Sequence, residues 1–206
     1  MTFPNKPYTT AKAYLDDYTR EVIAAYEAID GLQLEEAAAV LNDTIARDGQ
    51  IFSCGNGGSA AISNHLVCDH VKSVSTHTEL LPRVQSLSSC VEIITAIAND
   101  DSYAEVFRYQ LSRSGRKGDT LIAISSSGDS ENIVRAITWA KENGLATIAL
   151  TGFKGGRSRQ MADVSLHVET SNYGVVEDVH QSLMHILAQY IRQAHMDTDQ
   201  IEQVKF

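Results

Sequence analysis

Residues 51–70 read IFSCGNGGSAAISNHLVCDH, which has the pattern of a strand, a turn and a helix. The apolar run 51–54 predicts a buried strand, and the glycine-rich residues 55–59 predict a turn in which missing Cβ atoms let a ligand approach the main chain. The segment that follows is compatible with a helix whose first free amides point at a polar or anionic group. His65 and Asp69 are four residues apart and therefore share one helical face. The stretch is predicted to form half of a ligand site.

Strands and helices alternate along the chain after this stretch. Short apolar runs bounded by turn residues predict further strands at 84–87, 120–124, 146–150 and 164–168. Apolar spacing predicts helices at 91–98, 103–114, 131–142 and 175–191, and residues 151–156 are predicted to be a loop. This alternation predicts an α/β fold with a doubly wound parallel sheet in a flavodoxin-like, three-layer arrangement. Ligands are expected at the carboxyl ends of the strands.

Two extra N-terminal helices are predicted before the first strand, at 8–29 and 34–45. Because they precede the sheet, we expect them to pack outside it or against another subunit. The tyrosines of the first helix favour a subunit interface, since tyrosine covers apolar area and tolerates a wet edge. Packing onto the home domain remains the alternative.

The composition predicts one globular domain. The chain has 206 residues, of which 43% are hydrophobic and 21% charged. Its net charge of −9 provides no basic surface for nucleic acid or anionic lipid, so an anionic ligand would need local hydrogen-bond donors. Cys54, Cys68 and Cys90 lack CxxC spacing and favour a reducing compartment. With no signal-peptide pattern and no run of about 18 apolar residues, the sequence predicts a cytoplasmic protein that does not span a membrane.

A second turn, SSSGDS at residues 125–130, follows the strand predicted at 120–124. This turn offers the hydroxyls of its four serines and the free backbone amides at the start of the next helix. Together these groups can hold a phosphate dianion. The alternative is simple N-capping by Asp129 or Ser130, with the other serines solvated. One cap uses one side chain, so four hydroxyls at the carboxyl end of a strand favour phosphate binding.

Several ordered blocks of sequence resemble one known family, the sugar isomerase (SIS) domain. They are GNGGS with HLVCD, AIANDDSY, the block from GDTLIAISSSGDSENIVRAITWAKENG through ALTGFKGG, and EDVHQSLMH. Within the SIS family the resemblance is closest to the phosphoheptose isomerases, and it covers about residues 50–191. It implies an aldose–ketose isomerase that converts sedoheptulose 7-phosphate to D-glycero-D-manno-heptose 7-phosphate by an acid/base enediolate mechanism. The product would feed lipopolysaccharide or capsule precursor biosynthesis.

The resemblance also implies how the chain assembles and what it binds. It implies a homotetramer whose sites are shared between subunits, and one zinc ion supporting each site. The chain would be a single SIS domain, 1–206. Residues 1–48 would be N-terminal helices for assembly, and residues 49–195 would be the α/β core with the terminal helix.

Carried over residue by residue, the family pattern makes Asp69 and His185 the catalytic pair. Asp69 would take the proton from carbon while His185 handles the proton on oxygen, as an enediolate route requires. The same pattern implies a zinc site formed by His65, Asp69, Glu177 and His185. It implies substrate contacts from Asn56, Gly57, Gly58, Ser59, Asn99, Asp100, Ser125, Ser126, Ser127, Ser130 and Glu177.

Two positions depart from the family pattern. The family acid is glutamate, whereas Asp69 is shorter by roughly one bond length, and a misplacement of about 1 Å can cost about a hundredfold in rate. The family glutamine is replaced by Glu177, and two carboxylates close together favour a cation between them. On one straight helix Glu177 and His185 lie about 12 Å apart. Both can ligate one ion only if the helix begins after Glu177 or two subunits contribute.

Two other functions fit the same resemblance. One is a non-catalytic SIS module that binds a sugar phosphate or a protein partner, although such an adaptor has no need of Asp69 and His185. The other is isomerisation of another sugar phosphate, which the departures at Asp69 and Glu177 leave open. Individual residues also have structural alternatives: His65 and His185 as ordinary surface or core histidines, and residues 99–101 as a helix cap.

Overall fold

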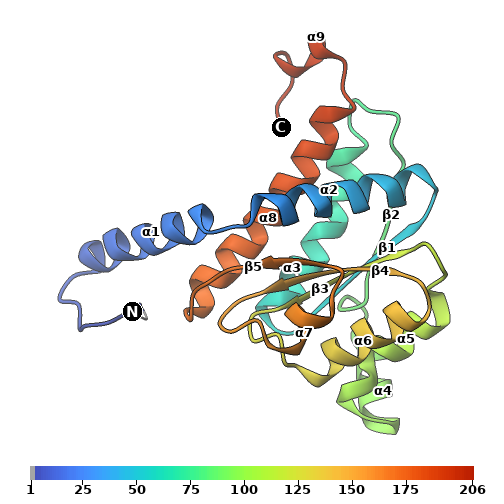
Figure 1. Ribbon diagram of the computed structural model, residues 1–206, viewed down its shortest axis with the longest axis horizontal. Helices are drawn as coiled ribbons and strands as arrows, with labels where there is room; N and C mark the ends of the chain where they lie inside the picture. The colour runs from blue at the N-terminus through green and yellow to red at the C-terminus, as the bar shows by residue number, and fades with distance from the viewer. Residues whose placement is uncertain (1–2) are drawn as a thin grey trace.

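A five-stranded parallel sheet forms the centre of the protein (Figure 1). The computed structural model describes residues 3–206. The strands run in the order β2-β1-β3-β4-β5, and every neighbouring pair is parallel. Their bounds are β1 Gln50–Gly55, β2 Arg83–Ser86, β3 Thr120–Ser125, β4 Ala146–Thr151 and β5 Val164–His167. The predicted α/β fold with a parallel sheet is therefore confirmed, and each predicted strand is present.

Helices cover both faces of the sheet, which makes three layers (Figure 1). One face carries α2 Gly31–Ala46, α3 Gly58–Cys68 and α8 Tyr173–Ala194, and the other carries α4 Val91–Asp100, α5 Val106–Ser114, α6 Glu131–Glu142 and α7 Gly156–Met161. Each face of the sheet has its own hydrophobic core: the first core lies under α2, α3 and α8, and the second under α4, α5, α6 and α7. Successive residues of β3 alternate between them, with Ile122 and Ile124 in the first core and Leu121 and Ala123 in the second. Because both faces are covered, every residue of β3 is buried.

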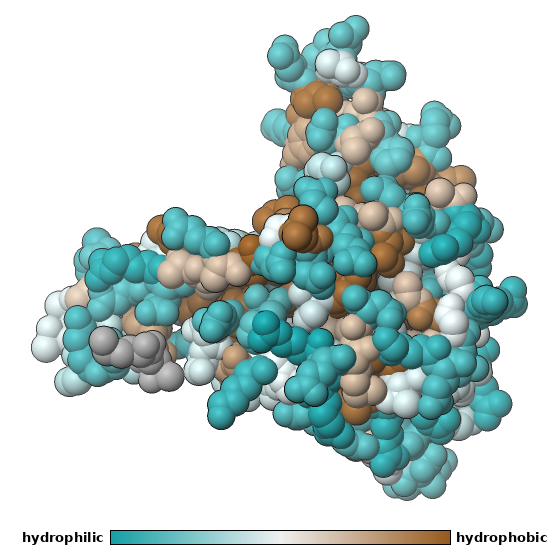
Figure 2. Space-filling view, viewed as in Figure 1, coloured by the Kyte–Doolittle hydropathy of each residue, from teal (hydrophilic) through white to brown (hydrophobic). Residues whose placement is uncertain are grey.

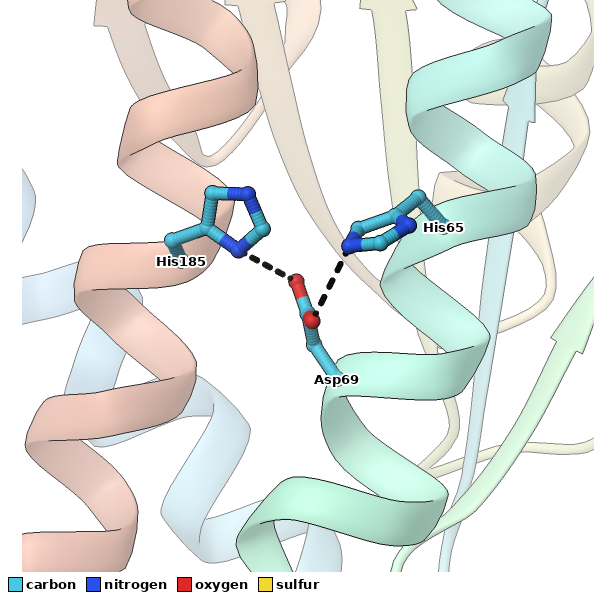
Figure 3. Close-up of side chains that lie close together, drawn as sticks. All are labelled: His65, Asp69 and His185. Atoms are coloured by element: carbon cyan, nitrogen blue, oxygen red, sulfur yellow. Dashed lines mark ion pairs between the residues drawn. The ribbon is translucent and has the colours of Figure 1, made fainter. Parts of the chain in front are cut away.

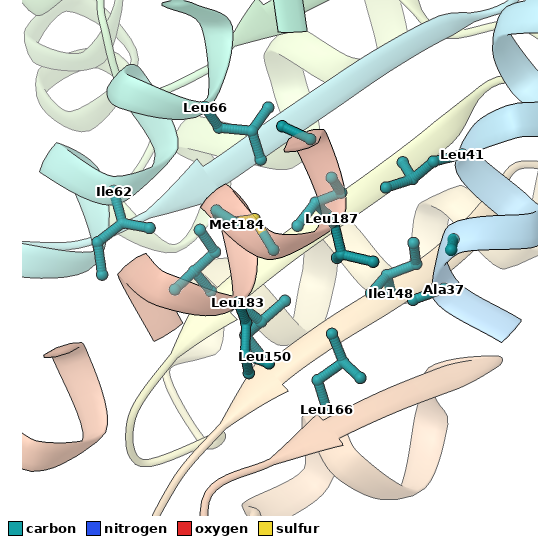
Figure 4. Packing of buried hydrophobic residues seen from close by; sticks show 14 of the residues in the cluster. Ala37, Leu41, Ile62, Leu66, Ile148, Leu150, Leu166, Leu183, Met184 and Leu187 are labelled. Atoms are coloured by element: carbon teal, nitrogen blue, oxygen red, sulfur yellow. The ribbon is translucent and has the colours of Figure 1, made fainter. Parts of the chain in front are cut away.

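The first core fixes α3 and α8 side by side on the sheet (Figure 4). Leu66 of α3, Leu183 and Met184 of α8 and Leu150 of β4 are each at most 1% exposed. Burying a side chain of this size stabilises the fold by about 1.5–3 kcal/mol. This packing is what brings residues of α3 and α8 close enough to form one site.

The first helix, α1 Ala11–Glu27, projects from the body of the protein (Figure 1). Thr10 caps it by accepting a hydrogen bond from the amide of Ala13, and Ala25 is its one fully buried residue. The Tyr18 hydroxyl ties it to α8 by donating to Asp178 at 2.6 Å. Figure 2 shows hydrophobic residues at the surface where this arm meets the body. The helix therefore contacts its own domain, and its expected role in assembly stays a prediction.

Some local structure differs from the sequence-based expectation. The segment predicted as a loop at 151–156 leads into the short helix α7, and the helix predicted at 103–114 begins with a separate 3-10 turn, Tyr103–Glu105. α3 continues into a π-helix, Asp69–Val74, and a short helix α9, Thr198–Ile201, follows α8. No helix within residues 3–206 has the length and apolarity that crossing a membrane requires.

His180 of α8 is a buried titratable group beside the carboxyl end of β4. Its side chain is fully buried, and its Nε2 lies 3.1 Å from the Thr151 carbonyl oxygen, to which it donates. Its Nδ1 is buried without a hydrogen-bond partner. Burial lowers the pKa of His180 from 6.5 to about 4; the bond to Thr151 opposes this shift, and nearby His167 adds to it.

Acid should therefore destabilise the protein through His180. Between pH 6.5 and about 4 the unfolded chain binds a proton that the folded chain excludes. The stabilising contribution is thus complete above pH 6.5 and is lost as the pH falls, by about 1.4 kcal/mol per pH unit. We expect the free energy of unfolding in urea to fall less between pH 7.5 and 5 for His180→Gln than for wild type. Equal losses in the two proteins would contradict this assignment.

Candidate active site

One carboxylate lies between two imidazoles where α3 and α8 face each other (Figure 3). Asp69 Oδ1 is 3.3 Å from His65 Nε2, and Asp69 Oδ2 is 2.9 Å from His185 Nδ1. The two imidazole centroids are 5.1 Å apart. Asp69 is only 7% exposed, whereas both histidines reach solvent. The structure therefore brings together His65, Asp69 and His185, as the sequence-based hypothesis expects.

The backbone brings the short side chain of Asp69 to this position. Asp69 ends α3 and is the first residue of the π-helix Asp69–Val74, which packs against α8. A π-helical turn inside or at the end of an α-helix is rare and frequently marks a functional site. Although aspartate is shorter than the glutamate that the resemblance implies, the carboxylate reaches both imidazoles in this chain.

Gln181 orients His185, and sequence reasoning missed it. Gln181 Nε2 lies 3.0 Å from His185 Nε2, a contact that holds the imidazole with Nδ1 facing Asp69. The Nδ1 contact is close but not aligned as a hydrogen bond, and Asp69 Oδ2 is buried without a hydrogen-bond donor. The spacing of four residues between Gln181 and His185 is the sequence signal that could have identified it.

These three side chains fit a divalent metal ion. One ligand atom from each of His65, Asp69 and His185 lies within 4.8 Å of the others. Two imidazole nitrogens and one carboxylate, with a fourth position open, suit zinc, and the undonated Asp69 Oδ2 has free acceptor capacity. Glu177 is the exception to the predicted ligand set. It is absent from this cluster because α8 is continuous from Tyr173 to Ala194, which separates Glu177 from His185 by about 12 Å.

A second feature, the serine pocket, lies at the carboxyl ends of the strands and has a volume of about 190 Å³. Its lining consists of Asn56, Ser59, Ile124, Ser125, Ser126, Ser127, Ser130, Tyr173 and Glu177. Ser126 Oγ is buried without a partner, and Ser130 occupies the N-cap position of α6 without capping any amide. Simple N-capping therefore does not account for these hydroxyls, which are available to a ligand.

The serine pocket is neutral except for Glu177. No Lys, Arg or His of residues 3–206 lines it. The Glu177 carboxylate lies against the first turn of α3, where a Cβ on Gly58 would be 2.4 Å from Glu177 Oε2. A carboxylate is favoured at a helix N-terminus. The N-terminus of α3 is thus already beside an anion, and the free hydroxyls surround the N-terminus of α6.

Arg157 of α7 and the loop before α7 support the serine loop, which the sequence did not reveal. Arg157 donates its backbone amide to Asp129 Oδ1 at 3.0 Å and its guanidinium to the Asp129 carbonyl at 2.8 Å, and it pairs with Glu131 at 3.0 Å. Hydrogen bonds from the Arg157 backbone and side chain hold the pKa of the Asp129 carboxyl below its usual value. Gly128 packs against this loop so closely that a Cβ would lie 1.9 Å from the Gly155 carbonyl oxygen.

The remaining predicted contacts lie at or outside the pocket. Gly57 and Gly58 are exposed at the start of α3, and Gly57 has a φ of 56° that disfavours a side chain. Asn99 and Asp100 are exposed at the end of α4, where the Asn99 amide donates to Asp100 at 2.8 Å. Neither lines the serine pocket of this chain. Tyr173, which does line it, was missed because the terminal helix was predicted to begin two residues later.

A larger cavity, of about 490 Å³, lies at the amino ends of the strands. Its charged lining includes Arg47, Arg83 and Asp119. Asp119 is already bonded, since it accepts from the amides of Gln50 at 2.8 Å and Arg116 at 2.7 Å. This cavity has no histidine in its lining and no acid–base pair, so the serine pocket and the Asp69 cluster are the better candidate site.

The fold and the serine pocket define an α/β protein of the sugar-phosphate-binding class. The SIS domain profile matches residues 13–152, and the chain belongs to the SIS domain family. It is 40% identical to the phosphoheptose isomerase of Nitratidesulfovibrio vulgaris Hildenborough over 144 residues, which are 70% of this chain and 69% of that protein. It is 38% identical to that of Colwellia psychrerythraea over 172 residues, 82% of this chain and 87% of that protein. The structure of phosphoheptose isomerase from Neisseria gonorrhoeae matches with a TM-score of 0.81 at 31% identity, covering 88% of this chain and 96% of that chain.

Gly128→Ala should disable the serine pocket. The new Cβ would clash with the Gly155 carbonyl, and alanine is strained at a φ of 70°. We expect the affinity for inorganic phosphate, measured by calorimetry, to fall by at least about tenfold, or ~1.4 kcal/mol. Gly31→Ala is the control, because a Cβ there has no neighbour within 4 Å. Wild-type phosphate affinity in a folded Gly128→Ala protein would contradict the placement of the phosphate.

Proposed function

We propose that this protein is an aldose–ketose isomerase that converts sedoheptulose 7-phosphate to D-glycero-D-manno-heptose 7-phosphate. The observation that carries this proposal is the buried Asp69 carboxylate held 2.9 Å from His185 on a neighbouring helix. The similarity to proteins named phosphoheptose isomerase, at 38–40% identity, supports the same substrate. A non-catalytic sugar-phosphate-binding or partner-binding module has no use for this pair, so the adaptor alternative gains no support.

The distance along α8 between the serine pocket and the Asp69 cluster favours a long sugar as the substrate. Glu177 lines the serine pocket, and His185 belongs to the Asp69 cluster. These two residues lie about 12 Å apart along one continuous helix. An open-chain heptose phosphate can place its phosphoryl group in the serine pocket, against residues 125–130, and C1 and C2 toward the Asp69 cluster. A three-carbon sugar phosphate is too short to engage both, which favours the heptose over the smallest alternatives.

The reaction moves a proton between C1 and C2 through an enediolate, which needs a base at carbon and an acid at oxygen. Asp69 accepts the proton from carbon and returns it to the neighbouring carbon. His185, oriented by Gln181, transfers the proton between the two sugar oxygens. The free hydroxyls of Ser126 and Ser130 and the amides of α6 hold the phosphoryl group so that the other end of the sugar stays in register.

The Asp69 cluster also provides a zinc site. His65, Asp69 and His185 would hold the ion, and their donor atoms are those that zinc prefers. A bound zinc ion would act as a Lewis acid that polarises the sugar oxygens. Glu177, by the serine pocket, is better placed to accept hydrogen bonds from sugar hydroxyls than to ligate this ion.

The proposal extends to the assembly of the protein, its compartment and its pathway. A homotetramer is supported by the α1 arm, which buries only Ala25 fully and leaves Leu15 55% and Ile23 51% exposed. Residues 1–48 would then serve assembly around the α/β core, 49–195. The free thiols of Cys54, Cys68 and Cys90 support a reducing, cytoplasmic compartment. The product would enter the synthesis of surface-carbohydrate precursors such as those of lipopolysaccharide or capsule.

Turnover of sedoheptulose 7-phosphate is the direct test. We expect wild type to form the aldose, and Asp69→Asn or His185→Gln to lower kcat by about 10²–10⁴-fold, the range of general acid–base catalysis. Asp16→Asn, which changes an exposed carboxylate on α1, should keep wild-type activity. A panel of five- to seven-carbon sugar phosphates run in parallel identifies the preferred substrate. No aldose from any of them, with wild type and Asp69→Asn alike, would refute the proposal.

Metal content tests the ligand set separately from activity. We expect elemental analysis to find about one zinc per chain after reconstitution and dialysis. His65→Ala and Asp69→Ala should lose it, because each removes one of three ligands. Glu177→Ala should retain it, since Glu177 stands apart from the cluster. Zinc lost from Glu177→Ala as completely as from His65→Ala would support the four-ligand set instead.

A further inference from the structure

Asn56 belongs to a closed network of hydrogen bonds beside the serine pocket. Its Oδ1 accepts from the Tyr103 hydroxyl at 2.8 Å and from Asn132 Nδ2 at 2.9 Å. Its Nδ2 donates to Asn132 Oδ1 at 3.0 Å, so the two amides are paired in both directions. Asn132 is 3% exposed and does not line the pocket, whereas Asn56 does.

A backbone amide fixes the orientation of both side chains. Asn132 Oδ1 also accepts from the backbone N–H of Ile133 at 3.0 Å. A backbone amide can only donate, so the atom of Asn132 that faces it must be the oxygen. The nitrogen of Asn56 must then face that same oxygen, and the oxygen of Asn56 must face the nitrogen of Asn132 and the hydroxyl of Tyr103. Neither amide can flip without losing several of these bonds.

The side chain of Asn56 has one hydrogen-bonding group left for a ligand. Its carbonyl oxygen has two lone pairs, and both are used by Tyr103 and Asn132. Its amide nitrogen has two hydrogens, and one is used by Asn132. The side chain can therefore offer the serine pocket a single N–H and no acceptor.

We propose that Asn132 is a positioning residue that fixes Asn56 as a one-hydrogen donor, so that Asn56 selects an acceptor oxygen of the ligand. This inference rests on the proposed function, in which Asn56 contacts the sugar phosphate. Asn132 lies in the first turn of α6, directly after the serine loop, whereas Asn56 lies in the glycine turn between β1 and α3. The amide pair thus links the two turns of the site and holds them in register. Tyr103 supports the same orientation from outside the pocket.

A mutant cycle tests this role. Dissociation constants for sedoheptulose 7-phosphate are measured by calorimetry in proteins that all carry Asp69→Asn, which blocks turnover. We expect Asn56→Ala and Asn132→Ala each to weaken binding by about tenfold, the size of one good hydrogen bond. The protein with both changes should bind no more weakly than Asn56→Ala alone, because Asn132 acts only through Asn56. In the otherwise wild-type enzyme the same changes should raise KM more than they lower kcat.

The controls separate positioning from simple stabilisation. Asn143→Ala removes an asparagine at the other end of α6 whose amide bonds only to the Trp139 carbonyl of the same helix, and it should leave the dissociation constant unchanged. If Asn132→Ala fails to fold, Tyr103→Phe replaces it, since Tyr103 is 55% exposed; we expect a two- to threefold loss that disappears in the Asn56→Ala background.

Two results would overturn the inference. One is wild-type affinity in Asn132→Ala or, where that protein does not fold, in Tyr103→Phe. The other is a doubly substituted protein whose loss equals the product of the two single losses. If Asp69→Asn binds no sedoheptulose 7-phosphate at all and wild type does not turn it over, the proposed function fails, and the inference fails with it.

Discussion

A buried carboxylate needs partners, and this constraint organises the site. Asp69 is 7% exposed, and its carboxylate lies within 3.3 Å of His65 on its own helix and 2.9 Å of His185 on a helix more than 100 residues later. That meeting depends on α3 and α8 packing side by side through Leu66, Leu183 and their neighbours in the first core. The parallel sheet sets the positions of both helices, so the meeting of Asp69 with His185 is a consequence of the fold.

The distribution of negative charge determines where a phosphoryl group can bind. The chain has a net charge of −9, and the serine pocket has no cationic side chain among the described residues. Glu177 already lies at the N-terminus of α3, whereas the Ser126 and Ser130 hydroxyls in the loop before α6 make no hydrogen bond among the described residues. A phosphate is therefore favoured at α6 and disfavoured close to Glu177. In the proposed function the sugar chain runs from α6 past Glu177 toward Asp69, which is the direction that the length of α8 allows.

The sequence predicted much of the fold because the strands are short apolar runs and the helices have clear ends. The helix predicted at 131–142 is observed as Glu131–Glu142, but α7 was missed because Gly155 and Gly156 are typical of a loop. Their conformation depends on contacts with Gly128 and Asp129 that only the tertiary structure supplies. The inclusion of Glu177 among the metal ligands stays a prediction, and within this chain the continuity of α8 holds Glu177 apart from His65, Asp69 and His185.

The site was predictable only in part, because some of its residues meet only in the tertiary structure. Local patterns identified the serine loop and the pair His65 and Asp69. His185 was predicted from the family resemblance and not from its spacing. Asn132 and Tyr103 could not be found from sequence, because their partner Asn56 lies far from them in the chain. The most direct test of the proposed site is a crystal structure of the protein with sedoheptulose 7-phosphate bound. We expect the phosphoryl group to lie within residues 125–130, with C1 and C2 beside an Asp69 carboxylate and a His185 imidazole. A phosphoryl group bound elsewhere, with C1 and C2 away from every Asp69 in the crystal, would contradict it.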